Sequence, residues 1–123
     1  MNGNEYQNLA MRTNDNRSIY RLLESVKNPR YTTGDLLNGV LGLTGEAGEV
    51  ADLVKKGIFH EKGIDIEHLK KECGDVLWYL AMICDSVGIT LNEVMQTNVD
   101  KLIARYPNGF DAYLANHRKP DDI

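Results

Sequence analysis

Two apolar stripes of helical period, separated by a short polar segment, most constrain how this 123-residue chain can fold. The first repeats at alternating steps of four and three residues: Leu36, Val40, Leu43, Ala47, Val50 and Val54. The second is similar: Leu69, Cys73, Val76, Leu80, Ile83 and Val87. Such spacing places apolar side chains on one face of an α-helix. We therefore predict helices over residues 33–59 and 65–87, joined through the loop 60–64 as an antiparallel hairpin.

Helix start and stop signals support the second long helix and predict a third. Asp65 is a favourable N-cap, and Gly88 follows the last apolar position, where a glycine commonly ends a helix. Thr90 and Glu93 have the spacing of a capping box. We therefore predict another helix over residues 90–106.

Two short helices are expected before the hairpin, over residues 4–12 and 18–26, and the Asn28-Pro29 pair ends the second of them. No stretch shows sustained strand alternation, and no linker divides the sequence. We predict an all-α fold, a helical bundle of three main helices plus the short N-terminal ones, completed by dimerisation. Its length fits a single domain over residues 1–123.

The balance of charges limits the partners of the chain. Apolar residues make up 42% and charged residues 26% of the sequence, as in an ordinary globular domain. The net charge is −4, whereas binding to a nucleic-acid duplex requires a basic face that displaces counterions. We therefore expect no nucleic-acid polymer as a partner, although a single nucleotide remains compatible with this charge.

We expect a cytoplasmic protein without a membrane partner. The longest apolar run, Val76 to Cys84, has nine residues, whereas a membrane-spanning helix needs about 20. The N-terminal sequence lacks the charged start and apolar core of a secretory signal. Cys73 and Cys84 lie too far apart on one helix for a disulfide, so we expect both to be small core residues.

Four acidic residues form two pairs with the same spacing. Glu46 and Glu49 are three residues apart on the first long helix, and Glu72 and Asp75 are three apart on the second. Each pair projects from one side of its helix, because residues at this spacing are neighbours on the helix surface. A single pair of this kind is common on solvated helices, so the interest lies in whether the two pairs meet.

Helical phase indicates that they do. With a rotation of about 100° per residue, both pairs lie on the same-handed flank of their apolar stripes, at nearly the same offset. Antiparallel packing brings these flanks together at matching heights. Converging carboxylates need a compensating cation, and an all-oxygen ligand set favours Mg²⁺, with Mn²⁺ as a substitute. The predicted metal ligands are Glu46, Glu49, Glu72 and Asp75. The three histidines are expected to be solvated.

Glycines are concentrated inside the predicted helices, where each costs about 1 kcal/mol relative to alanine. Gly45, Gly48 and Gly74 adjoin the acidic residues directly. Close approach of another helix or of a ligand would explain them, and tight helix packing alone would explain them equally well.

The third helix carries polar groups suited to a phosphate. Asn98 interrupts its apolar stripe and is expected to be a buried amide in need of partners. Lys101 and Arg105 follow on the same side, so they are candidate phosphate contacts, unless they are ordinary solvated cations. Tyr79, one turn beyond Asp75, is a candidate contact to the carboxylates or to a sugar. Trp78 points away and is expected in core or subunit packing.

The chain resembles the MazG-like nucleotide pyrophosphohydrolases of the all-α NTP pyrophosphatase group. The resemblance is carried by four segments of the chain: NEYQNLAMRT, LGLTGEAGEVADLVKK, KKECGDVLWYLA and NVDKLIARYPNGF. The paired acidic motif of the family, E-x-x-E then E-x-x-D, matches the four acidic residues described above. Asn98, Lys101 and Arg105 match a less specific pattern tied to substrate phosphates. The segment 15–32 matches poorly.

The resemblance implies a homodimer or homotetramer that hydrolyses a nucleoside triphosphate, NTP or dNTP, to the monophosphate and pyrophosphate. A role in nucleotide-pool house-cleaning is then expected. Metal would activate water for attack at the α-phosphorus, with Glu46 or Glu49 as the general base. The alternatives are a narrower dUTP, dCTP or phosphoribosyl-ATP pyrophosphatase and a non-catalytic, metal-binding helical interaction module.

Overall fold

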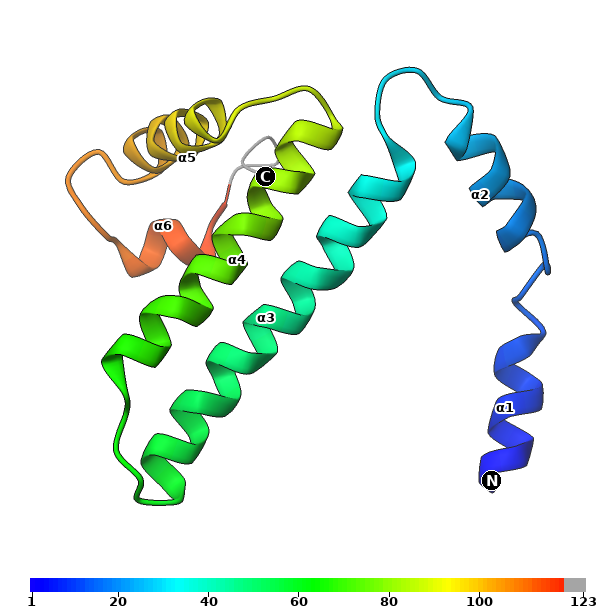
Figure 1. Cartoon of the computed structure of the whole chain (residues 1–123), viewed down its shortest axis with the longest axis horizontal. Helices are drawn as coiled ribbons and strands as arrows, with labels where there is room; N and C mark the ends of the chain where they lie inside the picture. The colour runs from blue at the N-terminus through cyan, green and yellow to red at the C-terminus, as the bar shows by residue number, and fades with distance from the viewer. Residues whose placement is uncertain (119–123) are drawn as a thin grey trace.

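The computed structural model describes residues 1–118 and contains six helices and no strand in that part of the chain (Figure 1). The last five positions of the predicted single domain, 119–123, lie outside the described residues. The helices are α1 (Gly3–Met11), α2 (Ser18–Val26), α3 (Thr33–Phe59), α4 (Ile66–Ser86), α5 (Leu91–Arg105) and α6 (Ala112–Asn116). The predicted all-α class is confirmed, and α6 is an additional short helix that the sequence analysis did not predict.

Local chemistry sets the ends of the helices. The Asp65 side chain accepts a hydrogen bond from the backbone N–H of His68 and so caps α4. Thr90 and Glu93 form the predicted capping box at the start of α5. Gly88 has a φ of 72°, a left-handed conformation that glycine adopts without steric cost after the end of α4.

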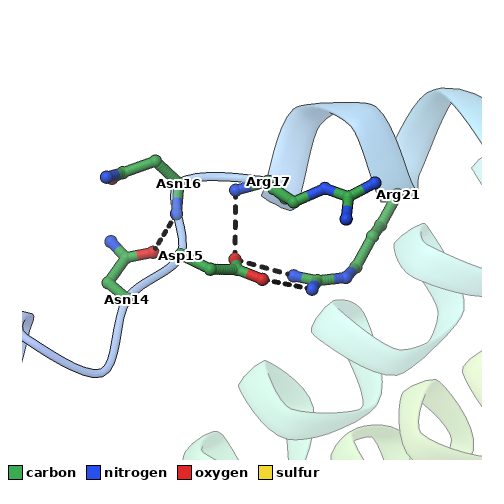
Figure 2. Close-up of polar contacts among 5 residues, drawn as sticks. All are labelled: Asn14, Asp15, Asn16, Arg17 and Arg21. Atoms are coloured by element: carbon green, nitrogen blue, oxygen red, sulfur yellow. Dashed lines mark hydrogen bonds and ion pairs between the residues drawn. The ribbon is translucent and has the colours of Figure 1, made fainter.

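A polar turn separates α1 from α2 (Figure 2). Asn16 has a φ of 57°, and its backbone N–H donates to the Asn14 side chain at 3.0 Å. Asp15 accepts from the backbone N–H of Arg17 at 3.1 Å and from both terminal nitrogens of Arg21. This bidentate pair lowers the pKa of the Asp15 carboxyl. The turn therefore holds the first residues of α2 in place through contacts between neighbours in sequence.

The centre of the fold is the antiparallel hairpin of α3 and α4, which run side by side over most of their length (Figure 1). At the end of the hairpin opposite the connecting loop, the backbone N–H of Thr32 donates a hydrogen bond to the Ser86 carbonyl at 2.8 Å. The α2 helix is attached at the same end, because the buried Thr33 hydroxyl donates to the Ser25 carbonyl at 2.8 Å. The hairpin therefore provides the frame to which the N-terminal helices are joined.

Two glycines let the helices of the hairpin approach closely. A methyl group added at Gly39 would lie 2.7 Å from Cγ1 and 3.3 Å from the backbone nitrogen of Ile83. A methyl group at Gly42 would lie 2.1 Å from the Tyr79 ring. All three distances are shorter than van der Waals contact, so these two glycines are needed for the helix packing itself.

The face that α3 presents to α4 is rotated from the predicted stripe. The residues on this face are at least half-buried and follow steps of three and four: Leu36, Gly39, Leu43, Glu46, Val50, Leu53 and Gly57. Val40 is 46% exposed, and Ala47 is exposed as well. The stripe prediction missed this rotation because it assigned the interface to the larger apolar side chains, whereas glycines allow the closest backbone approach.

Much apolar surface remains accessible in the single chain. Within residues 1–118, Cys84 is the one apolar side chain, glycine aside, that is buried, whereas Cys73 is exposed, so the expectation that both cysteines are core residues is wrong for Cys73. Leu41 is 72% exposed and Trp78 56%. The chain exposes 10,093 Å², whereas a compact monomer of its mass exposes about 6,600 Å².

The C-terminal helices lie to one side of the hairpin. Figure 1 shows α5 projecting away from the upper end of α4 and the chain returning through α6 towards the middle of that helix. Within the described residues, no single helix is long and apolar enough to cross a membrane, and α4 with α5 satisfies that length and composition only as a pair bent by 101°.

Candidate metal centre

Three carboxylates meet between the two long helices. Glu46 comes from α3, and Glu72 and Asp75 come from α4. Each offers one oxygen, and these oxygens all lie within 4.8 Å of one another. We call these three residues the acidic cluster. An oxygen-lined group of this kind suits a hard divalent cation such as Mg²⁺ or Mn²⁺.

The acidic cluster lies in the helix interface rather than beside it. Glu46 and Glu72 are both half-buried and occupy interface positions of their helices, while Asp75 is exposed at the edge. Helical phase predicted all four carboxylates on a common flank. The rotation of α3 described above accounts for the difference, because it turns Glu46 towards α4.

Glu49, the fourth predicted ligand, lies outside the acidic cluster. It is exposed and stands one turn closer to the loop than Glu46. It remains near enough for its charge to act on Glu46, and it lines a hollow that Glu72 also lines. The structure thus brings three of the four predicted carboxylates together and places the fourth beside them.

The environment of Glu46 disfavours its charged form. Partial burial is the main cause that raises the pKa of the Glu46 carboxyl above its usual value. The negative charges of Asp75, Glu72 and Glu49, in that order, raise it further. This is the electrostatic condition that a bound cation relieves.

His68 holds Glu72 in position, a contact that the sequence analysis missed. The Nε2 atom of His68 lies 2.7 Å from Oε1 of Glu72, and the Glu72 side chain is only 17% exposed. The two residues are four apart on α4, so the signal was an i,i+4 spacing that the sequence already contained. His68 itself is exposed, as expected.

The other two members of the acidic cluster have no cationic partner in the described part of the chain. The salt bridges there involve neither Glu46 nor Asp75. Three carboxylates packed together without a lysine or arginine are costly unless another positive charge compensates them. The donor set and its uncompensated charge therefore fit a divalent metal ion.

A hollow of about 300 Å³ adjoins the acidic cluster at the closed end of the hairpin. Its walls come from the last turns of α3, the connecting loop and the first turns of α4, and include Glu49, Lys56, Lys62, His68 and Glu72. Lys56 is held by Asp52, with Nζ and Oδ2 2.5 Å apart. The hollow thus joins two of the predicted metal ligands to two lysines.

The predicted phosphate contacts on α5 lie elsewhere in the single chain. Asn98 is exposed, so the expected buried amide is wrong: α5 packs too little against the hairpin to cover its apolar stripe. Asn98 and Lys101 line a separate hollow of about 570 Å³, together with Val94 and Thr97. Arg105 lies over the ring of Tyr106, 5.8 Å from its centroid.

Aromatic residues near the acidic cluster have packing roles. The Tyr79 ring lies against Gly42 and makes an edge contact with Trp78, with ring centroids 4.9 Å apart. A substrate contact by Tyr79 stays a prediction. Trp78 is largely exposed, so of the two expected roles, core packing and subunit packing, only subunit packing fits it.

The glycines next to the carboxylates behave differently from those at the helix interface. A methyl group added at Gly45, Gly48 or Gly74 would meet no atom of the described chain within 4 Å. Packing between α3 and α4 therefore does not explain these three residues, and close approach by something outside the single chain remains the explanation consistent with them.

Comparison with known proteins agrees with this geometry. The model of the MazG nucleotide pyrophosphohydrolase domain matches residues 35–110, which include α4, α5, most of α3 and all four carboxylates. The Gene 37 protein of Mycobacterium phage L5 is 38% identical over 73 residues. That stretch covers 56% of this chain and 64% of the phage protein, so the chain spans less than two thirds of this relative. No solved structure matches the chain.

Proposed function

Because the chain belongs to the MazG nucleotide pyrophosphohydrolase family, we propose that it hydrolyses nucleoside triphosphates, NTP or dNTP, to the monophosphate and pyrophosphate. The observation that carries this proposal is the acidic cluster, in which carboxylates from two helices converge without a cationic partner for two of them. Removal of unwanted nucleotides from the cellular pool is the role that we propose for this reaction. Free thiols at Cys73 and Cys84 suit a reducing compartment such as the cytoplasm.

We propose that Glu46, Glu72 and Asp75 hold Mg²⁺, for which Mn²⁺ can substitute, and that Glu49 lies beside these ligands without binding the ion itself. A divalent cation supplies charge neutralisation for the leaving pyrophosphate and lowers the pKa of water. Within the chain, the contact of His68 with one oxygen of Glu72 supports the orientation of this carboxylate.

Glu49 is the general base that we propose. It lies outside the acidic cluster and is exposed, so its carboxylate is more accessible to a water molecule than the half-buried Glu46. In this role it accepts the proton of the water that attacks the α-phosphorus. Glu49→Gln should then lower kcat by about 100-fold or more while leaving metal affinity within a few-fold of wild type.

A second copy of the chain is proposed to complete the site. The exposed area exceeds that of a compact monomer by several thousand Å², and obligate dimers bury about 2,000–5,000 Å². Leu41 and Trp78 belong to the surface available for this contact. Asn98 and Lys101 line a hollow apart from the carboxylates of their own chain. We therefore propose that the α5 helix of a second subunit reaches the carboxylates of the first.

A nucleotide panel tests the proposed reaction. The purified chain is incubated with Mg²⁺ or Mn²⁺ and each common NTP and dNTP, with phosphoribosyl-ATP included, and pyrophosphate is scored against orthophosphate. We expect the monophosphate and pyrophosphate in equal amounts. Release of orthophosphate alone would falsify the proposed bond cleavage, and binding of metal without any turnover would support the interaction module instead. Preference for dUTP, dCTP or phosphoribosyl-ATP would establish the narrower activity.

A further inference from the structure

The charge of a polyphosphate poses a problem that the acidic cluster alone does not solve. The terminal phosphates of the substrate carry most of its negative charge, and they must lie near carboxylates that are negative as well. A divalent ion neutralises part of this charge, and lysines or arginines commonly bind the remainder. The cations that share a cavity with the carboxylates are therefore the first candidates to consider.

Two lysines meet this condition at the closed end of the hairpin. Lys56 and Lys62 line the same hollow as Glu49 and Glu72, and the capping Asp65 and the Lys56 partner Asp52 line it as well. Lys101, the lysine suggested by the resemblance, lines a different one. Among the hollows found in residues 1–118, the one at the hairpin end thus combines metal-ligand candidates with lysines.

The two lysines differ in their pairing with carboxylates of the chain. Lys56 is oriented by its 2.5 Å contact with Asp52, which also raises the pKa of the lysine. Lys62 forms no salt bridge with any residue of the described range. Its neighbours Glu61 and Gly63 have φ values of 55° and 75°, so the loop turns sharply on both sides of Lys62.

The size of the hollow limits which part of the substrate it can hold. Its volume is about 300 Å³, at the lower end of the range of roughly 300–1,000 Å³ for ligand pockets. It accommodates phosphate groups and water better than a whole nucleotide. Resting on the proposed function, we infer that this hollow binds the terminal phosphates of the substrate, and the pyrophosphate released from them, through Lys62 and Lys56.

Binding of inorganic pyrophosphate tests this assignment without turnover. Calorimetric titration of pyrophosphate with excess Mg²⁺ is compared between the wild-type chain, Lys62→Ala and Lys62→Arg. The matched control is Lys55→Ala, because Lys55 is an exposed neighbour that does not line the hollow. We expect Lys62→Ala to weaken pyrophosphate binding by about tenfold or more, Lys62→Arg to restore most of it, and the control to bind as wild type.

The outcomes separate this inference from the proposed function. If nucleotides are hydrolysed to pyrophosphate while Lys62→Ala binds pyrophosphate like wild type, the site assignment is wrong and the proposed function stands. If no nucleotide is hydrolysed while Lys62→Ala selectively loses pyrophosphate binding, the anion site stands and the reaction is wrong. Failure of the wild-type chain to bind pyrophosphate, or equal weakening by Lys55→Ala, would overturn the inference.

Discussion

The hairpin of α3 and α4 and the N-terminal pair of α1 and α2 are stabilised by opposite means. The hairpin is held by contacts between residues far apart in sequence, such as Gly39 with Ile83. The N-terminal pair is held by contacts between near neighbours, such as Asp15 with Arg21, and has no buried residue in either helix. Figure 1 shows the same contrast, with α1 standing well apart from the hairpin.

The hairpin assembles the acidic cluster within a single chain, whereas the N-terminal pair needs a second surface to cover its apolar side chains. All members of the acidic cluster belong to the hairpin, so one chain suffices to assemble them. The α2 helix instead exposes a row of apolar side chains, including Ile19, Leu23 and Val26. Such a face gains little stability until a second surface covers it.

The largest expected effect comes from crowding the hairpin at Gly39. Glycine to alanine usually stabilises a helix by about 1 kcal/mol, but at Gly39 the new methyl group meets the backbone of Ile83. We expect Gly39→Ala to lower the free energy of unfolding by about 1–3 kcal/mol, measured by urea denaturation.

Gly34→Ala is the matched control, because a methyl group at Gly34, also in α3, meets nothing within 4 Å. It should be neutral or stabilise by up to about 1 kcal/mol. Equal stability of Gly39→Ala and Gly34→Ala would show that close packing does not hold the hairpin.

A smaller effect is expected from the pH dependence of the metal-free protein. Because the folded state raises the pKa of Glu46 above its usual 4.5, this carboxyl binds more protons in the folded chain than in the unfolded chain just above that pH. The contribution of Glu46 to the free energy of unfolding should therefore fall as pH rises from 4.5 through the raised pKa. Urea unfolding with a chelator should show that the free energy of unfolding of wild type, relative to that of Glu46→Gln, falls over this pH range. An identical slope in both proteins would exclude crowding of charge at this position.

The smallest effect is expected in the N-terminal pair. Folding lowers the pKa of Asp15, so its contribution is present above the unfolded pKa, near 3.8, and is lost as pH falls through the folded value. The pair with Arg21 is solvent-exposed and screened by salt, so Asp15→Asn should lower the melting temperature only slightly. Turnover should not change. A melting temperature lowered as far as in Gly39→Ala would contradict the contrast between the two regions.

Local signals predicted the helices well. The Asp65 cap and the Thr90 capping box lie where the sequence placed them, since caps depend on residues within one turn. Helix α6 was missed, although Asp111 caps it, because a five-residue helix has no apolar period to detect. The tertiary arrangement of α5 depends on contacts beyond its own sequence and was not predictable in the same way.

The acidic cluster was predicted in identity more accurately than in position. The spacing of the pairs identified Glu46, Glu72 and Asp75, because their approach to one another depends only on the helical repeat and on the antiparallel direction of the hairpin. The rotation of α3 was not predictable from apolar residues, because the approach at Gly39 and Gly42 sets it. This rotation moves Glu46 into the interface and leaves Glu49 outside the acidic cluster.

The most direct test of the central claim is metal binding to the acidic cluster. Mn²⁺ is titrated calorimetrically into the metal-free wild-type chain, Glu72→Gln and Glu67→Gln. Glu67 is the matched control, since it lies on α4 but is exposed and paired with Lys70. We predict that Glu72→Gln weakens Mn²⁺ binding by at least about tenfold and that Glu67→Gln binds as wild type. Equal affinity of Glu72→Gln and wild type would contradict the assignment of the metal centre.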